Sequence, residues 1–223
     1  MPEDIFSERN RMAYDGGLAN ILFYDIVSQQ KVSAGIASVD AANCYDRVAH
    51  SIASLVFQSF GVREKPVTAM LEAIEEMQFF PQTSYGDSKD FSGSTIELKM
   101  QGLCQGNLCQ GNGAAPAGWC VISITILQCQ KSKGYGAKFL SPISLVKTDL
   151  AAILFIDDTN ILHLIMGKIE SIDDTFEGLQ DSVNNWGKLL IATGGARKPP
   201  KFFYILLDFE WNARGKWKYK LHH

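Results

Sequence analysis

The feature that most constrains the fold is an acidic pair, Asp157–Asp158, which sits between two apolar runs. The runs over residues 151–156 and 161–165 have the length and the β-branched content of buried strands. Residues 157–160 form a polar stretch of hairpin length between them. We therefore expect an antiparallel hairpin with both carboxylates at its tip, where a merely hydrophilic turn is the plainer alternative.

Asp40 follows the short β-like run 36–39, just as Asp157 follows the run 151–156. If the run 36–39 lies beside the hairpin in one sheet, Asp40 converges with Asp157 and Asp158. Adjacent carboxylates repel one another, and a divalent cation that prefers hard oxygen ligands relieves the repulsion. Such groups would hold two Mg²⁺ or Mn²⁺ ions about 3.5–4 Å apart, as in enzymes that catalyse in-line displacement. A helix cap is the alternative role for Asp40.

Helix and hairpin patterns alternate along the rest of the chain. Helical patterns extend over residues 11–30, 46–61, 66–77, 114–130 and 171–190, and strand or hairpin patterns over 82–100 and 202–219. Asp46 would cap the second helix and Gly61 would end it. Ser171 and Asp174 form a capping-box-like start for the last helix. This order predicts an α+β fold, an antiparallel sheet with helices packed on one face.

Composition excludes several classes of protein. The chain has 223 residues, 46% of them hydrophobic and 20% charged, which suits one globular domain with at most a small appendage and excludes a disordered chain. Residues 1–11 are polar, so no signal peptide is expected, and the longest apolar stretch, 119–127, is too short to cross a bilayer. We therefore expect an intracellular protein, of the nucleus or the cytoplasm, without a membrane partner.

The five cysteines are odd in number and lack the spacing of a disulfide framework, which indicates a reducing compartment. Cys104, Cys109, Cys120 and Cys129 offer a zinc site as an alternative. No CxxC pair is present, however, and two of these residues lie in an apolar run. Buried or loop thiols are the favoured interpretation.

Charge is distributed unevenly, although the net charge is only −3. From Gly194 onward the chain carries seven Lys or Arg and two acidic residues, a net charge of +5, while the preceding residues carry −8. An acidic body with a basic tail fits a metal-binding centre beside an edge that contacts phosphates. A solvated charged surface is the plainer interpretation of the tail.

Five short motifs resemble, in the same order, the palm domain of reverse transcriptases. They are Asp40–Asp46 with an aromatic residue five positions after the first Asp, Phe155-Ile156-Asp157-Asp158, the Gln-Gly loop at 110–116, the Gly- and Lys-containing turn at 194–201, and the hairpin from Asp208 to Trp217. The Gln-Gly loop lies between the two aspartate motifs in the chain. Each motif is weak alone, but their order and the helices between them make the resemblance specific. It is closest to retroelement polymerases of eukaryotic microbes.

The resemblance implies an RNA-directed DNA polymerase that adds deoxynucleotides to a primer by two-metal-ion catalysis. Asp40 and Asp157 would be the principal ligands of two Mg²⁺ or Mn²⁺ ions, and Asp158 a third carboxylate with a weaker role. Lys201, or with less support Lys198, would protonate or neutralise the leaving pyrophosphate.

The resemblance also implies a nucleotide site and a set of partners. Tyr45 would lie under the incoming sugar and exclude a 2′-hydroxyl, and Gln110 and Gly111 would pack near the nascent base pair. Residues 1–35 would belong to the fingers, and 36–223 would form the palm with a C-terminal hairpin like the primer grip. The partners would be an RNA template, a DNA primer and deoxynucleoside triphosphates. The rest of the fingers and a thumb would lie outside this chain, so we expect weak template–primer binding by the chain alone.

The chain departs from the family pattern in one place. Leu103-Cys104-Gln105-Gly106-Asn107 is copied at residues 108–112, within the Gln-Gly loop. Either Gln105 or Gln110 can take the functional place, and Gln110 is favoured because it leads into Gly-Ala-Ala-Pro. The copy also suits an alternative function, a catalytically inactive or fragmentary reverse-transcriptase-like module that acts in binding or structure.

Overall fold

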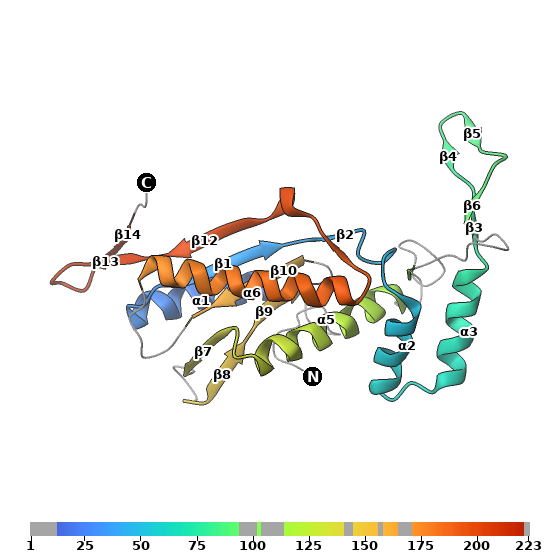
Figure 1. Cartoon of the computed structure of the whole chain (residues 1–223). Coiled ribbons are helices and arrows are strands. Elements are labelled where there is room, and N and C mark those ends of the chain that lie inside the picture. Colours follow the sequence, from blue (N-terminus) through green and yellow to red (C-terminus); the bar gives the residue numbers. More distant parts are fainter. Residues whose placement is uncertain are drawn as a thin grey trace. The chain divides into compact units, whose positions relative to one another are not determined.

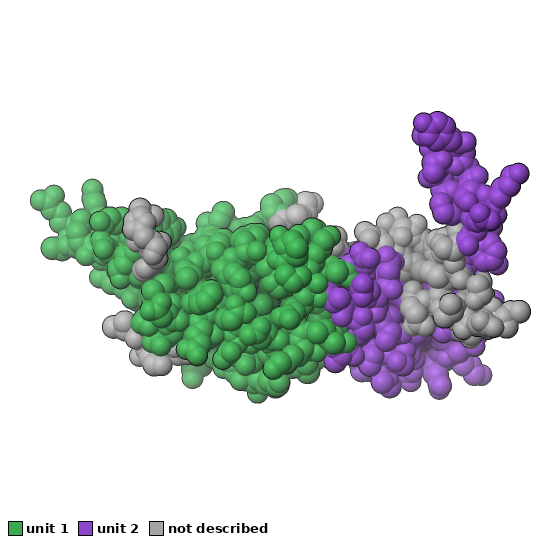
Figure 2. All heavy atoms as spheres, turned by 45° about the horizontal axis from the view of Figure 1, so that its top comes forward, with its two compact units in different colours: residues 1–42, 123–191, 197–223 green, residues 43–122, 192–196 purple. Residues whose placement is uncertain are grey.

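The computed structural model describes residues 13–93, 102–103, 114–140, 145–155, 158–164 and 171–220. The chain divides into two compact units, which Figure 2 distinguishes by colour. Unit 1 contains residues 1–42, 123–191 and 197–223, and unit 2 contains residues 43–122 and 192–196. Among the described helices, none combines the length and the hydrophobicity needed to cross a membrane.

A four-stranded antiparallel sheet with the strand order β12-β1-β10-β9 forms the centre of unit 1 (Figure 1). Its strands are β1 (Ala34–Val39), β9 (Ala152–Phe155), β10 (Asp158–His163) and β12 (Phe203–Leu207). Strand β1 is an inner strand. It pairs with β10 from Gly35↔His163 to Val39↔Thr159, and with β12 from Ala34↔Leu207 to Ser38↔Phe203. Three segments that are far apart in the sequence are thus fixed in register with one another.

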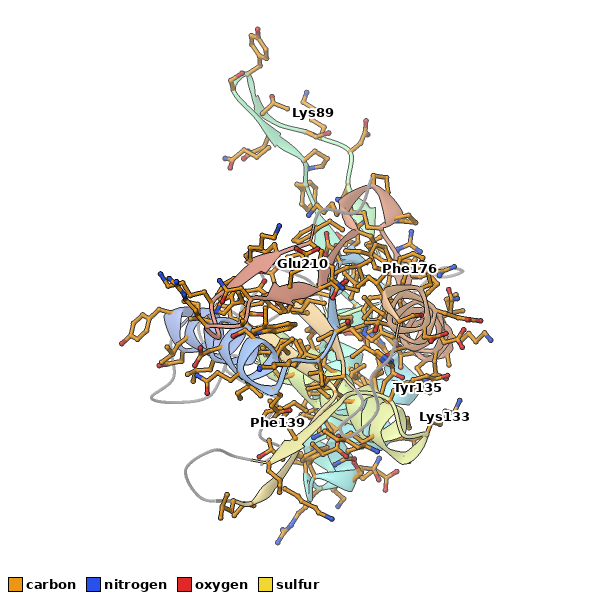
Figure 3. The ribbon with its side chains drawn as sticks, turned by 90° about the vertical axis from the view of Figure 1, so that its left-hand side faces the viewer. Lys89, Lys133, Tyr135, Phe139, Phe176 and Glu210 are labelled. Carbon is orange, nitrogen blue, oxygen red and sulfur yellow. The ribbon has the colours of Figure 1, made fainter. Side chains whose placement is uncertain are left out.

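Helices α1 (Ala13–Gln30) and α6 (Ile172–Ala192) cover opposite faces of this sheet, as Figure 3 shows. Gly35 faces α6, where an added Cβ would lie 2.8 Å from Cδ2 of Leu179. On the other face, the Asn160 amide donates a hydrogen bond of 3.5 Å to Oδ1 of Asn20 in α1. The α+β class is confirmed, but helices lie on both faces and not on the single face expected. Helical periodicity predicts a buried stripe and does not say which face of a sheet that stripe will cover.

The core of unit 1 between α1 and the sheet joins residues from most of its elements. Phe23 and Val27 of α1 are buried against residues of β1, β9, β10 and β12. The smaller strands of this unit are β2 (Ala41–Ala42), β7 (Ala137–Leu140), β8 (Lys147–Leu150), β13 (Phe209–Trp211) and β14 (Trp217–Tyr219). Strand β7 pairs with β8, and β13 with β14. The strand β11 (Ala196–Arg197) and the 3₁₀ turn η1 (Pro199–Lys201) precede β12.

The capping box at the start of α6 is confirmed. The Asp174 N–H donates to Oγ of Ser171 at 3.1 Å, and the Ser171 N–H donates to Oδ2 of Asp174 at 3.4 Å. Both bonds are local, because they join residues three positions apart. They fix the first turn of the helix without help from distant parts of the chain.

Unit 2 is built from α2 (His50–Ser59), α3 (Glu64–Glu75) and the start of α5 (Ala114–Ser132). The α5 segment is helical as expected, in spite of its β-branched residues. After α3 come β3 (Gln78–Phe79), β4 (Gln82–Thr83), β5 (Gly86–Asp87) and β6 (Ser92–Gly93), where β3 pairs with β6 and β4 with β5. The hairpin expected over 82–100 therefore begins earlier, at Gln78. Its expected second strand, 95–100, lies outside the described residues.

The prediction that Asp46 caps α2 is wrong, whereas Gly61 ends the helix as expected with a φ of +86°. Helix α2 begins at His50, and its N-cap residue Ala49 makes no side-chain capping bond. The Asp46 N–H donates to the Asn43 carbonyl at 3.0 Å, and the Ala49 N–H donates to the Thr193 carbonyl at 3.0 Å. These bonds hold residues 43–49 in a turn, which delays the start of the helix.

Candidate functional site

The hairpin that carries the acidic pair is present, but its turn is shorter than predicted. Strand β9 ends at Phe155 and β10 begins at Asp158, so Asp158, Thr159 and Asn160 belong to a strand and not to the turn. Thr159 is 2% exposed and pairs with Leu154 on one side and Val39 on the other. Pairing on both sides draws these polar residues into the sheet, which a sequence pattern read along one segment cannot show.

The register of the sheet brings two predicted site residues to the same edge. The last pair between β1 and β10 is Val39↔Thr159. Extending the ladder by one pair places Asp40 across from Asp158, where opposite Cβ atoms in antiparallel strands lie about 4.5–5.5 Å apart. Opposite residues point to the same face of a sheet. The geometry thus supports two carboxylates side by side at the end of the two inner strands.

Lys201 lies directly on Asp40. Its Nζ is 2.7 Å from Oδ2 of Asp40, whose side chain is 15% exposed while that of Lys201 is 59% exposed. The turn that presents Lys201 is also bonded to Asp40 through the backbone, because the Lys198 N–H donates to the Asp40 carbonyl at 3.1 Å. Lys201, predicted as a site residue on the resemblance alone, is therefore in contact with a predicted metal ligand.

Other lysines of the basic tail also have acidic partners within unit 1. Nζ of Lys218 is 2.9 Å from Oε2 of Glu210, and Nζ of Lys220 is 3.1 Å from Oδ2 of Asp208. The first pair is exposed, so it contributes about 0–1 kcal/mol and opens easily. Both acids are already counted in the net charge of +5 of the tail, so only the pairing of Lys201 with Asp40 lowers that charge further.

The C-terminal hairpin β13–β14 carries an aromatic cluster. Phe209 is 2% exposed and is surrounded by Trp211, Trp217 and Tyr219 with ring centroids 5.0–5.5 Å away. Trp217 and Tyr219 remain about half exposed, at 48% and 51%. A basic hairpin with exposed rings is the composition of a surface on which nucleic acid bases stack.

Asp208, at the base of this hairpin, is a structural residue whose role the sequence pattern did not reveal. Its carboxylate is 11% exposed. It accepts hydrogen bonds from the Phe209 N–H at 2.9 Å, the Ser33 hydroxyl at 3.4 Å and Lys220 Nζ. Burial, and then the charge of Tyr219 in this hairpin, raise the pKa of Tyr24 in α1 above its usual value of 10.0.

Tyr45 belongs to unit 2 and is buried there at 5% exposure. Its ring meets that of Trp119 edge to face, with centroids 6.4 Å apart, and its carbonyl accepts a hydrogen bond of 2.6 Å from the Leu103 N–H. Gly102 adopts a φ of +84°, and a Cβ there would collide with the backbone of Asp46. Residues 102–103, which directly precede the Gln-Gly loop in the chain, thus hold the Tyr45 segment in place.

His50 connects three parts of unit 2. Its Nδ1 lies 3.0 Å from Oε1 of Glu75, and its Nε2 lies 2.7 Å from the Gly102 carbonyl. A carbonyl oxygen can only accept, so Nε2 of His50 donates to Gly102. These contacts give His50 a structural role in unit 2, and no sequence signal pointed to its partners.

Several predicted site residues, namely Asp157, Gln110 and Gly111, lie outside the described residues. Within the described ranges, no group of three or more His, Cys, Asp or Glu side chains is arranged to hold a metal ion. The zinc alternative fails for two of its four cysteines. Cys120 and Cys129 lie nine positions apart on α5, about 13.5 Å along the helix axis, too far apart to bind one ion together.

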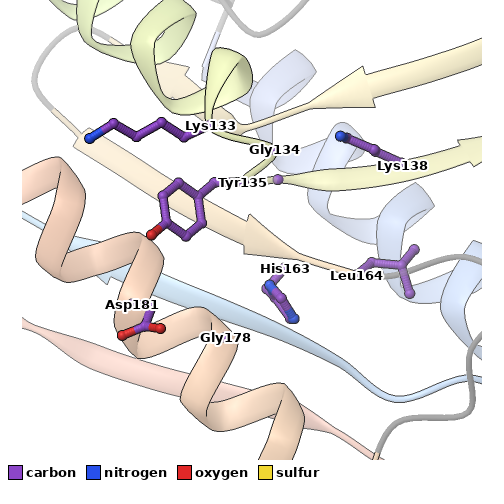
Figure 4. A pocket seen from close by; sticks show the side chains of 9 residues that line it. Lys133, Gly134, Tyr135, Lys138, His163, Leu164, Gly178 and Asp181 are labelled. Carbon is purple, nitrogen blue, oxygen red and sulfur yellow. The ribbon is translucent and has the colours of Figure 1, made fainter.

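A cavity of about 430 Å³ lies elsewhere in unit 1 (Figure 4). Its lining includes Tyr135, His163, Gly178 and Asp181. His163 is at the end of β10, whereas Asp158 is at the beginning of that strand. At about 3.3 Å per residue the two ends are roughly 16 Å apart, so the cavity is separate from the acidic edge.

The sheet, its register and the helices around it form an α+β fold that solved telomerase structures share. Among solved structures, the chain is similar to apo telomerase from Candida tropicalis truncated from its C-terminal domain, with a TM-score of 0.54, 15% identity, and coverage of 96% of this chain and 41% of that one. It is also similar to telomerase from Candida tropicalis in complex with the TWJ fragment of telomeric RNA, with a TM-score of 0.52, 14% identity, and coverage of 90% and 30%. This chain therefore spans less than half the length of either structure.

No protein-family model matches the sequence, and no curated protein matches it. At 15% identity the likeness to telomerase concerns the fold. The predicted α+β class is thus confirmed, and any chemistry depends on the residues described above.

Proposed function

We propose that this chain is the core of an RNA-directed DNA polymerase that extends a primer with deoxynucleotides. The observation that carries the proposal is the register of β1 and β10, which supports a position for Asp40 beside Asp158 at the edge of a reverse-transcriptase-like sheet. The origin of the chain in a retroelement stays a prediction.

Asp40, Asp157 and Asp158 would hold two Mg²⁺ or Mn²⁺ ions. Carboxylate oxygens are the hard donors that these ions prefer, and the ammonium group of Lys201 on Asp40 marks a position that attracts a cation. Bound metal would activate the primer hydroxyl and stabilise the charge of the leaving pyrophosphate. The β1–β10 register would hold the carboxylates of this chain in position before any ligand binds.

Other residues of the chain would position the substrates. Tyr45, held by Trp119 and Leu103, would exclude a 2′-hydroxyl from the sugar site, and Gln110 with Gly111 would contact the nascent base pair. Lys201 would neutralise or protonate the leaving pyrophosphate. The aromatic hairpin β13–β14 would bind the primer strand through its exposed rings.

The partners would be an RNA template, a DNA primer and deoxynucleoside triphosphates. One of the similar telomerases was solved with a fragment of telomeric RNA, which supports RNA as a partner here. Fingers and thumb segments from outside this chain would complete the binding groove. The compartment would be the nucleus or the cytoplasm.

Primer extension on an RNA template, with Mg²⁺ or Mn²⁺ and deoxynucleotides, tests the proposal. We expect extension by the parent chain, and a loss of about 100-fold or more in Asp40→Asn and Asp157→Ala, since each removes a metal ligand. Asp87→Asn is the matched control, because it removes the same charge from an exposed position on β5. Equal extension by Asp40→Asn and Asp87→Asn would overturn the assignment of the site.

If the parent chain extends no primer, metal-dependent thermal stabilisation separates the two remaining functions. Stabilisation by Mn²⁺ in the parent and in Asp87→Asn, but not in Asp157→Ala, would indicate an intact metal centre in a chain that does not extend a primer by itself. Absence of stabilisation in all three would favour the alternative, a non-catalytic module that acts in binding or structure.

A further inference from the structure

The contact between Lys201 and Asp40 places a positive charge on a carboxylate that the proposed function assigns to a divalent ion. The two atoms, Nζ and Oδ2, are 2.7 Å apart, the distance of a charge-assisted hydrogen bond. The carboxylate is largely enclosed at 15% exposure, whereas more than half of the lysine side chain, 59%, faces solvent. The acid is therefore enclosed, whereas most of the lysine side chain is in contact with solvent.

The backbone around Lys201 fixes its starting point. Pro199 and Pro200 restrict the turn η1, which is closed by bonds from the Lys201 N–H to the Lys198 carbonyl at 3.0 Å and from the Phe202 N–H to the Pro199 carbonyl at 2.9 Å. The bond from the Lys198 N–H to the Asp40 carbonyl ties this turn to the end of β1. The lysine thus reaches Asp40 from a rigid base and not by chance from a loose tail.

The sheet register explains why a cation is needed there. The β1–β12 pairs end at Ser38↔Phe203, and the turn η1 that precedes β12 lies beside the end of β1. The β1–β10 pairs end at Val39↔Thr159, one position before Asp40 and Asp158. Two carboxylates in neighbouring positions repel each other, and the lysine offsets one of the two charges. A divalent ion on Asp40 would in turn be repelled by an ammonium group on the same carboxylate.

We propose that Lys201 is a built-in counter-ion, which occupies Asp40 when no metal is bound and leaves that carboxylate when a divalent ion binds. The inference rests on the proposed function, because it takes Asp40 as a metal ligand. Because 59% of the lysine side chain faces solvent, water can hydrate its ammonium group when it leaves the carboxylate. The released ammonium stays near the site on its flexible stem, where a triphosphate can meet it. Metal affinity is consequently set by a competition within the chain.

Binding of Mn²⁺, followed by the electron paramagnetic resonance signal of the free ion, tests the inference without any need for catalysis. We expect Lys201→Met to bind Mn²⁺ about three- to tenfold more tightly than the parent, because a competing charge is removed. Lys201→Arg keeps that charge and is expected to bind like the parent. Lys198→Met is the matched control, since it changes the net charge equally and keeps the backbone bond to Asp40. Thermal unfolding of each variant checks that it folds.

The outcomes distinguish the counter-ion role of Lys201 from the metal site itself. Tighter binding in Lys201→Met alone, with loss of binding in Asp40→Asn, supports the counter-ion. Unchanged or weaker binding in Lys201→Met, while the parent binds Mn²⁺, overturns the counter-ion and leaves the metal site intact. Equal tightening in Lys198→Met and Lys201→Met also overturns it, because net charge then explains the effect. Absence of Mn²⁺ binding in the parent and in Lys201→Met removes the metal site and the inference together.

Discussion

Asp40 in unit 1 and Tyr45 in unit 2 are only five positions apart, yet the two units hold them by different means. Asp40 ends a strand whose residues pair on both sides, with β10 and with β12. Tyr45 lies in a turn that is held by a few contacts from distant residues, among them Leu103, Trp119 and the backbone at Gly102. Asp40 is placed by many repeated backbone hydrogen bonds, and Tyr45 by a small number of specific contacts.

This difference predicts where each unit is sensitive to mutation. In a β-ladder, the neighbouring backbone pairs still hold the strand when one pair is weakened. Single mutations there should therefore have moderate effects on stability. In unit 2, Gly102 and His50 each make contacts that no neighbouring residue can replace. The predictions below test this contrast, in order of decreasing expected effect.

Gly102→Ala is expected to destabilise the protein by about 3 kcal/mol or more. The added Cβ collides with the backbone of Asp46, which cannot rotate away, and the φ of +84° is unfavourable for alanine. Gly61→Ala is the matched control, because its φ is +86° and nothing lies within 4 Å of the added Cβ. It should cost only about 1 kcal/mol. Urea unfolding measures both, and equal losses would show that backbone conformation alone, not the contact, makes Gly102 necessary.

His50→Ala is expected to cost about 2 kcal/mol, since it removes two hydrogen bonds from a buried position. Gln58→Ala, on the same helix, removes one exposed bond of 3.0 Å to Ser54 and should cost less than about 0.5 kcal/mol. Thermal unfolding compares the two variants. A loss in His50→Ala no larger than that in Gln58→Ala would contradict the role of His50 as a connector.

Asp208→Ala tests whether unit 1 also depends on single contacts. We expect a loss of about 1–2 kcal/mol, because the enclosed carboxylate accepts bonds from Ser33, the Phe209 N–H and Lys220. Glu210→Ala removes a half-exposed acid paired with Lys218, and should change stability by about 0–1 kcal/mol. Urea unfolding measures stability, and near-UV circular dichroism reports the aromatic cluster. A loss as large as that of Gly102→Ala would break the contrast between the units.

The smallest effect is expected at high pH. Because burial and the charge of Tyr219 raise the pKa of Tyr24 in the folded chain, the neutral phenol is favoured by folding. Its contribution to stability is complete below the usual pKa of 10.0 and is lost as the pH rises through the higher folded value. Absorbance of tyrosinate near 295 nm should show one late-titrating group that disappears in Tyr24→Phe. A late group that persists in that variant would assign the shift to another tyrosine.

Local signals in the sequence predicted local structure well. The capping box of Ser171 and Asp174, the end of α2 at Gly61 and the helical stripe of α6 all depend on residues within one or two turns of each other. The hairpin around Asp157–Asp158 was predicted for the same reason, from the apolar runs on either side. Its turn was placed wrongly because Thr159 and Asn160 are drawn into the sheet by β1, which lies far away in the sequence.

Sequence patterns did not predict contacts between residues that lie far apart in the chain. Asp46 is a good capping residue, but backbone bonds such as that from Ala49 to Thr193 keep residues 43–49 in a turn. The two bonds of His50 and the three donors around Asp208 join segments whose proximity only the fold decides. Lys201 was proposed from a family resemblance, and its contact with Asp40 followed only from the register of β12 against β1.

The central position of β1 also governs the order in which the protein can assemble during synthesis. Ile36 pairs with Leu162 and Ile205, so a ribosome that adds about 5–20 residues per second needs roughly 6–25 s to make the first partner and longer to make the second. Until its partner strand has been made, each edge of β1 can pair with strands of other chains. A nascent chain interrupted before η1 would carry a sheet with an unprotected edge, and Asp40 would lack its partner Lys201.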